Sequence, residues 1–121
     1  MEITVKPLIY GYVRIEDGSS EDDIQQAEQR MKHLARAEGF SYERTFYEYV
    51  SGDHSTFEEL IAEIQRVEAR AVIVPSYEHL SAHPILFQIM VERLSQEASA
   101  CLWTVEGDAP IGADDATLGG I

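Results

Sequence analysis

The feature that most constrains the fold is a regular alternation of strand-like and helix-like segments. Apolar, β-branched and aromatic runs typical of strands occupy residues 7–15, 42–50, 70–76 and 100–105. Apolar residues at helical spacing predict helices over about residues 21–38, 57–68 and 84–97. Strands that alternate with helices imply right-handed crossovers and a mainly parallel sheet of four or five strands, with helices on both faces.

Residues that start and stop helices support these segments. Either Ser19 or Ser20 is placed to cap the first helix, and Gly39 is placed to end it. Thr56 is expected to cap the second helix. Pro84 suits the first turn of the third helix, where its missing N–H has no intrahelical partner to lose.

Charge narrows the classes of partner. The chain has 121 residues, with 22 acidic side chains against 9 Lys plus Arg, and a formal net charge of −13. Such a surface repels phosphate backbones, because affinity for DNA comes largely from Lys and Arg that displace counterions. Anionic membranes are disfavoured for the same reason. No run of the sequence is basic enough to predict a local exception, so we expect no nucleic acid and no membrane partner for this chain alone.

The domain organisation is simple. We expect one α/β domain over residues 1–106 and a flexible, acidic, Gly-rich tail over 107–121. The single Cys101 rules out an internal disulfide. The first residues lack a basic and apolar leader, and no apolar run approaches the ~20 residues of a membrane span, so we expect a cytoplasmic location. We also expect no cofactor.

The predicted topology places polar residues together at the carboxyl ends of the strands. Ligands of open parallel sheets collect beyond the carboxyl ends of the strands. In this sequence those ends carry residues 14–17, 48–54 and 76–79. We therefore expect the functional site there.

These segments resemble the N-terminal catalytic domain of the serine recombinases, the resolvase/invertase group, from about Ile9 to Val105. The landmarks that carry the likeness are "YGYVRI", "DDIQQAEQ", "YEYVSG", "FEEL" and "VIVPSYEHLSAHP". The resemblance implies a resolvase-like fold. In that family a serine attacks a DNA phosphodiester and arginines stabilise the charge on the transferring phosphate.

Carried over position by position, the resemblance implies a degenerate site. Its positions in this sequence are Arg14, Glu16, Gln25, Glu48, Ser51, Phe57, Glu78, His79 and Ala82. Arg14 matches the arginine two residues before the nucleophile, but Glu16 stands where the serine is expected. Gln25 and Ser51 keep the residue types of the family.

The remaining positions depart from the family. Glu48 stands at an aspartate of the second strand, and Phe57 falls where an arginine is expected. Glu78 and His79 replace an Asp-Arg pair, and Ala82 replaces the last arginine. Arginines on a transferring phosphoryl group are each worth on the order of 10³–10⁵ in rate in well-studied systems. We therefore expect recombinase chemistry to be lost. Ser19, Ser20 and Ser51 are better explained as cap and turn residues than as substitute nucleophiles.

Two other functions stay open for the residues at the carboxyl ends of the strands. Glu16, Glu48, Glu78 and His79 have ligand types that bind a divalent metal, which would make the chain a metal-dependent enzyme. Alternatively, they are solvated acids at strand ends, with Arg14 paired to Glu16, Glu48 or Glu78. Arg14 together with His79 would also suit a small anion.

The partner expected from the sequence is a protein. The helix over 84–97 is apolar over more than one face, so part of it suits contact with another protein or another copy of this chain. In the family a long helix after the fourth strand drives dimerisation and leads to a DNA-binding domain. This sequence ends at "ATLGGI", about where that helix would begin, so we do not expect that interface. The leading hypothesis is an inactive recombinase-like domain that acts by binding protein.

Overall fold

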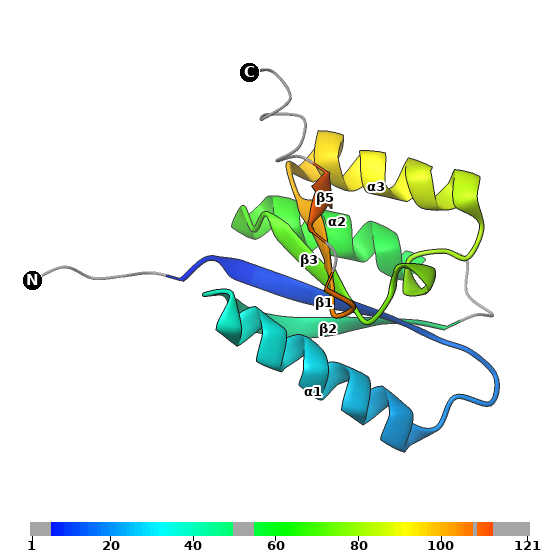
Figure 1. Ribbon diagram of the computed structural model, residues 1–121. Coiled ribbons are helices and arrows are strands. Elements are labelled where there is room, and N and C mark those ends of the chain that lie inside the picture. The colour runs from blue at the N-terminus through cyan, green and yellow to red at the C-terminus, as the bar shows by residue number, and fades with distance from the viewer. Residues whose placement is uncertain (1–5, 50–54, 108, 113–121) are drawn as a thin grey trace, which may run out of the picture.

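The computed structural model describes residues 6–49, 55–107 and 109–112, and these form a five-stranded sheet flanked by helices (Figure 1). The strands are β1 (Leu8–Ile15), β2 (Ser41–Tyr49), β3 (Ala71–Val74), β4 (Cys101–Thr104) and β5 (Ile111–Gly112). Their order across the sheet is β2-β1-β3-β4-β5. The first four pair in parallel and β5 is antiparallel to β4, which confirms the predicted α/β class with its mainly parallel sheet.

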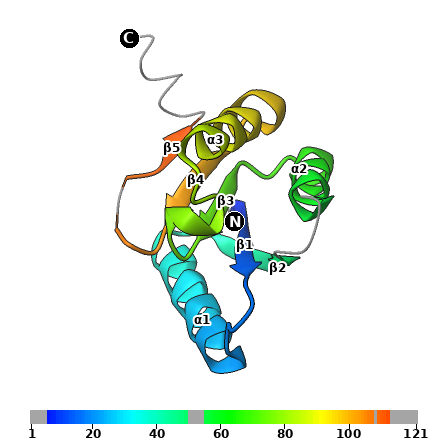
Figure 2. The same ribbon diagram turned by 90° about the vertical axis from the view of Figure 1, so that its right-hand side faces the viewer.

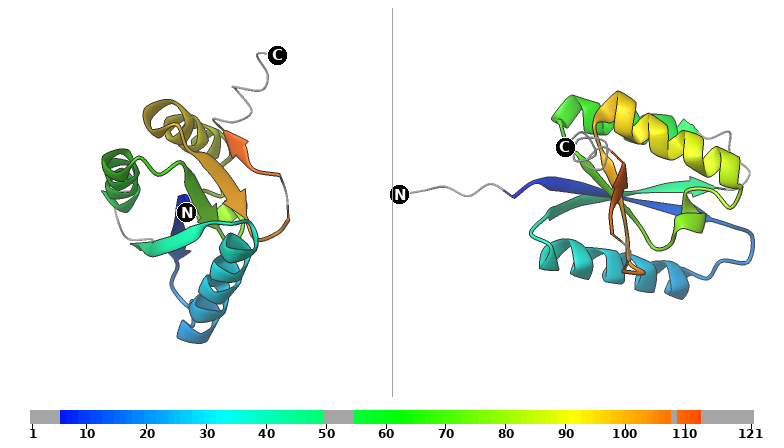
Figure 3. Two further views of the ribbon diagram at one scale, coloured as in Figure 1. Left: turned by 90° about the vertical axis from the view of Figure 1, so that its left-hand side faces the viewer. Right: turned by 45° about the horizontal axis from the view of Figure 1, so that its top comes forward.

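The helices cover both faces of the sheet. They are α1 (Glu21–Ala37), α2 (Ser55–Val67) and α3 (Pro84–Ala98), with a 3₁₀ turn, η1 (Tyr77–His79), after β3. Figures 2 and 3 show α1 alone on one face, and α2 and α3 together on the other. None of the helices described is both long and apolar enough to cross a membrane.

Capping explains where the helices begin. The Oγ of Ser20 accepts a hydrogen bond from the Asp23 N–H at 3.0 Å, so Ser20 is the N-cap of α1, as one of the two predicted alternatives. Pro84 occupies the first turn of α3, as predicted. The prediction for α2 is wrong by two residues, because the helix already begins at Ser55 and therefore contains Thr56.

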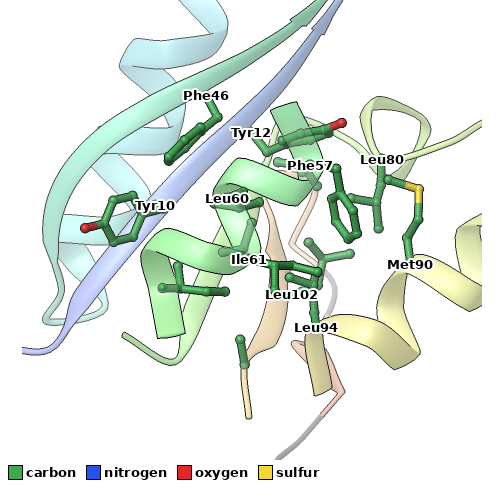
Figure 4. Close-up of a cluster of buried hydrophobic side chains, with 14 of the residues drawn as sticks. Tyr10, Tyr12, Phe46, Phe57, Leu60, Ile61, Leu80, Met90, Leu94 and Leu102 are labelled. Carbon is green, nitrogen blue, oxygen red and sulfur yellow. The ribbon is translucent and has the colours of Figure 1, made fainter. Parts of the chain in front are cut away.

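The core has two parts, one on each face of the sheet. The larger lies between the sheet and the α2–α3 pair, where Tyr10, Tyr12 and Phe46 from the strands meet Phe57 and Leu60 from α2 (Figure 4). The smaller lies under α1, where Met31 packs on Ile9, Val13 and Ile73 of the sheet. The side chains of β1 therefore alternate between the two cores, as a strand buried on both faces requires.

A glycine in β1 makes room for an aromatic ring. The hydroxyl of Tyr42 lies over Gly11, and a Cβ added there would fall 1.9 Å from the Tyr42 Oη and 3.2 Å from the Met31 Cε. Tyr42 is also held by a 2.6 Å hydrogen bond between its hydroxyl and the Thr45 Oγ1. Gly11 is thus required by close packing.

The segment after residue 107 is not all loop. Ile111 and Gly112 form β5, with Ile111 opposite Leu102 and Gly112 opposite Cys101, so the prediction of a flexible tail is wrong at these two residues. The physical reason is that Ile111 packs against the larger core and adds an edge strand beside β4. Residues 113–121 lie outside the described part of the chain.

The third helix presents apolar residues to both sides. Met90 and Leu94 are buried, and Leu86, Phe87 and Val91 are half-buried against the core. Ile85 and Ile89 lie one turn apart on the outer side, with 67% and 47% of their surface exposed. The wide apolar arc predicted from the sequence is therefore mostly core, with an exposed remainder at Ile85 and Ile89.

Candidate functional site

The candidate site lies at the carboxyl ends of β1, β2 and β3. Arg14 is near the end of β1, and its register partner on β2 is Glu48. Glu16 follows β1 directly, and His79 is the last residue of η1, after β3. The parallel pairing of these strands brings their ends to one edge, as the sequence predicted.

Arg14 pairs with the residue that stands at the expected nucleophile position. Its Nε lies 3.9 Å from the Oε2 of Glu16, and the exposed fractions of the two side chains are 24% and 68%. Among the described residues Arg14 makes no ion pair with Glu48 or Glu78, so of the three predicted partners only Glu16 is found. A long, solvated pair of this kind contributes about 0–1 kcal/mol, so it holds Arg14 only weakly.

Glu48 is an internal brace of the site. Only 3% of its surface is exposed, and its Oε1 accepts two hydrogen bonds, from the Tyr12 hydroxyl at 3.0 Å and from the Phe57 N–H at 3.3 Å. Burial, and then the neighbouring Glu48 carboxylate, raise the pKa of Tyr12 well above its usual value. Tyr12 therefore stays protonated and keeps donating to Glu48. These bonds join β1, β2 and the first turn of α2.

His79 is tied to the backbone of β1. Its Nδ1 accepts a hydrogen bond from the Arg14 N–H at 3.1 Å, so this nitrogen carries no proton and the neutral ring holds its proton on Nε2. Burial lowers the pKa of His79, although the carboxylates of Glu16 and Glu78 oppose that shift. The imidazole is thus favoured in its neutral form.

The turn after β1 is closed by serines. The Oγ of Ser19 accepts from the Glu16 N–H at 3.1 Å, and the Ser19 N–H donates to the Glu16 carbonyl at 3.0 Å. Ser20 caps α1. Both hydroxyls therefore serve local structure as turn and cap residues, and the loss of the nucleophile stays a prediction.

The other predicted positions are dispersed. Gln25 lies on an exposed part of α1, and Glu78 and Ala82 are also exposed. Phe57 is buried in the larger core, where its ring packs edge-on against Tyr12 at 5.9 Å between centroids. Ser51 lies outside the described residues.

The metal-site alternative has no support in the geometry. Across residues 6–49, 55–107 and 109–112, no three His, Cys, Asp or Glu side chains gather closely enough to hold a metal ion. Glu16, Glu48, Glu78 and His79 are thus not brought together as a ligand set. The physical reason is that Glu48 is drawn into the core by Tyr12 and the N-terminus of α2, while Glu16 and Glu78 are exposed to solvent.

Sequence reasoning missed Tyr12. The sequence predicts Tyr12 only as part of an apolar strand, whereas the structure shows that its hydroxyl donates to Glu48. A usable signal was present, because Tyr12 lies two residues before Arg14 and alternate residues of a strand share a face. A tyrosine two residues before a site arginine therefore belongs on the same face as that arginine.

Comparison with known proteins identifies the family. The model of the resolvase N-terminal domain matches residues 9–119. The crystal structure of the N-terminal catalytic domain of TP901-1 integrase is similar to this fold, with a TM-score of 0.70 over 85% of this chain and 80% of that one, at 17% sequence identity. A comparison with curated proteins found no match. The family match extends over nearly the whole sequence and agrees with the element order and sheet topology, and this chain belongs to the resolvase N-terminal domain family.

Proposed function

We propose that this chain is a resolvase-type domain that does not cleave DNA and instead acts by binding protein, with a second copy of itself as the first partner to test. The observation that carries the proposal is the Arg14–Glu16 pair. A carboxylate stands where the resemblance places the serine, and the nearest cation already faces it at 3.9 Å between Arg14 Nε and Glu16 Oε2.

Charge at the site supports the loss of cleavage. Of the positions carried over from the family, Arg14 alone carries a permanent positive charge, and Glu16, Glu48 and Glu78 have carboxyl side chains. A phosphodiester brought to this edge would meet repulsion where the transition state needs positive charge. The neutral His79 adds none, because its Nδ1 is occupied by the Arg14 N–H.

The first experiment tests cleavage. Wild-type protein and Glu16→Ser are incubated with supercoiled plasmid and with a nicked oligonucleotide substrate that traps a covalent intermediate. We expect no nicking and no protein–DNA adduct from either protein, because the serine alone does not restore the missing cations. Cleavage by Glu16→Ser would show that the missing serine hydroxyl alone accounts for the loss of activity. Cleavage by wild type would overturn the proposal.

An exposed apolar patch supports protein binding. Ile85 and Ile89 are adjacent on the outer side of α3, with 67% and 47% of their surface exposed. Apolar side chains that gather on one side of a helix favour contact with another protein. The high negative charge opposes self-association at low salt, so contact between two copies should tighten as salt screens the repulsion.

The second experiment tests this contact. Sedimentation equilibrium of wild type, Ile85→Lys and Ile89→Lys is compared at about 50 and 300 mM salt, with Gln96→Lys as a control for added charge on an exposed position of the same helix. We expect association that increases with salt and is lost only in the two isoleucine variants. If wild type is an inert monomer throughout and captures no partner in pulldown, the protein-binding proposal fails.

A further inference from the structure

A hollow at the amino ends of β1 and β2 is lined by three basic side chains. It has a volume of about 340 Å³ and is lined by Lys6, Lys32, Arg36, Phe40, Ser41 and Tyr42. Lys6 lies just before β1, Lys32 and Arg36 are one turn apart near the end of α1, and Ser41 begins β2. The hollow is thus at the amino ends of the strands, away from the Arg14 site.

This concentration of positive charge is a local basic cluster that no run of the sequence predicts. Three of the nine Lys and Arg residues meet here in a chain of net charge −13, and none of the described residues that line the hollow is acidic. The cluster is invisible in the sequence because its members come from two separate segments. The pairing of Leu8 with Ser41, and the hydrogen bond from the Ser41 N–H to the Pro7 carbonyl at 2.8 Å, bring those segments together.

The three cations are not neutralised by the described residues. Ion pairs in that part of the chain involve Arg14, Arg66 and Arg93, each with nearby glutamates, and none involves Lys6, Lys32 or Arg36. Arg36, in the last turn of α1, also complements the helix dipole. That interaction does not account for Lys6, which reaches the hollow from outside the helix.

The walls of the hollow are fixed by packing. Tyr42 is held over Gly11 by its 2.6 Å hydrogen bond to Thr45, and the Lys32 Nζ lies 5.8 Å from the centre of the Tyr42 ring. Phe40 packs edge-on against Trp103, with 5.2 Å between ring centroids. These two aromatic walls lose little conformational entropy when a ligand enters, whereas the exposed Lys6, Lys32 and Arg36 side chains become ordered on binding.

We propose that this hollow binds a small phosphate-bearing anion, of the size of a diphosphate or a nucleoside diphosphate. An arginine offers paired donors to phosphate oxygens and two lysines add compact positive charge, which suits a multiply charged anion better than a monocarboxylate. The volume is within the range of small-ligand sites. This site is separate from the proposed loss of cleavage and stands whether or not that proposal holds.

Isothermal titration with pyrophosphate and with ADP tests the proposal, using the whole chain at low salt. We expect saturable 1:1 binding that weakens at least tenfold in Lys32→Gln and in Arg36→Gln. Arg70→Gln is the matched control, because it also removes one exposed cation but lies outside the hollow. We expect binding by this control to stay within twofold of wild type. The fluorescence of Trp103, the chain's single tryptophan, gives a second readout through its contact with Phe40.

Three results would overturn the proposal. The first is no saturable binding of either ligand at millimolar concentration. The second is equal weakening in Arg36→Gln and Arg70→Gln, which indicates diffuse charge attraction. The third is an oligoglutamate peptide that binds at least tenfold more tightly than pyrophosphate, which indicates an acidic-peptide site. Urea unfolding of each variant checks that the exposed substitutions leave the fold intact.

Discussion

Replacing Glu48 by alanine tests whether the buried carboxylate at the candidate site is a structural brace. The substitution leaves the Tyr12 hydroxyl and the Phe57 N–H without their acceptor, 3.0 and 3.3 Å away in the native chain. Each orphaned buried donor costs about 1–3 kcal/mol, so we expect a loss of about 2–6 kcal/mol in the free energy of unfolding. For a domain of this size each kcal/mol lowers Tm by roughly 3–6 °C.

The assay is urea unfolding followed by circular dichroism, with Glu43→Ala as the control. Glu43 is an exposed glutamate on the same strand, and its replacement should change stability by no more than about 0.5 kcal/mol. Tyr12→Phe alone should cost about 1.5–3 kcal/mol, and the double variant less than the sum of the two singles. Equal unfolding midpoints for Glu48→Ala and Glu43→Ala would refute the brace.

Three further predictions follow from the packing and the titrating groups. Gly11→Ala should lower the free energy of unfolding by about 1–3 kcal/mol, measured in urea, because the added methyl group meets the Tyr42 ring. Tyr42→Ala should lower it less in the Gly11→Ala protein than in wild type. Strictly additive effects of the two substitutions would contradict the close approach of Tyr42 to Gly11. Burial and the bond to Glu63 raise the pKa of Tyr10 to about 12. The unfolded chain therefore loses this proton first, and stability should decline between about pH 10 and 12 by at most ~1.4 kcal/mol per pH unit from this group. Tyr10→Phe should show a shallower decline, and an unchanged slope would count against the assignment. Burial lowers the pKa of His79, so the unfolded chain takes up a proton first as the pH falls below about 6.5, and stability drops there. The difference in urea midpoint between pH 7.5 and 5.5 should be smaller in His79→Gln than in wild type, and an equal difference would reject this role for His79.

Local patterns predicted most of the fold. Nearly continuous apolar runs identified the first four strands, and the 3.6-residue period identified all three helices, because burial on both faces of a sheet and on one face of a helix selects apolar residues in those patterns. A fifth strand was allowed for, but its position at Ile111 and Gly112 was not predicted, because two residues carry no periodicity and Ile111 packs on a core formed by residues elsewhere in the sequence. The start of α2 was misplaced because Ser55 and Thr56 are both residues that favour a helix start.

The candidate site was less predictable than the fold. The predicted parallel topology brought Arg14, Glu16 and His79 to the same ends of the strands, but it did not predict that the Arg14 N–H donates to His79. It could not place Glu48 in the core, because that depends on a tyrosine from β1 and a backbone N–H from α2 meeting one carboxylate oxygen. Contacts among three separate elements leave no short-range trace in a sequence. The same holds for the meeting of Lys6 with Lys32 and Arg36.

Intact-protein mass spectrometry after incubation with a trapping oligonucleotide tests the central claim most directly. The account predicts that the protein keeps the mass of its sequence, because Glu16 is a poor nucleophile for a phosphodiester and, of the positions carried over from the family, Arg14 alone is a permanent cation. A species heavier by the mass of one cleaved oligonucleotide end, mapped to any serine of the chain, would contradict it.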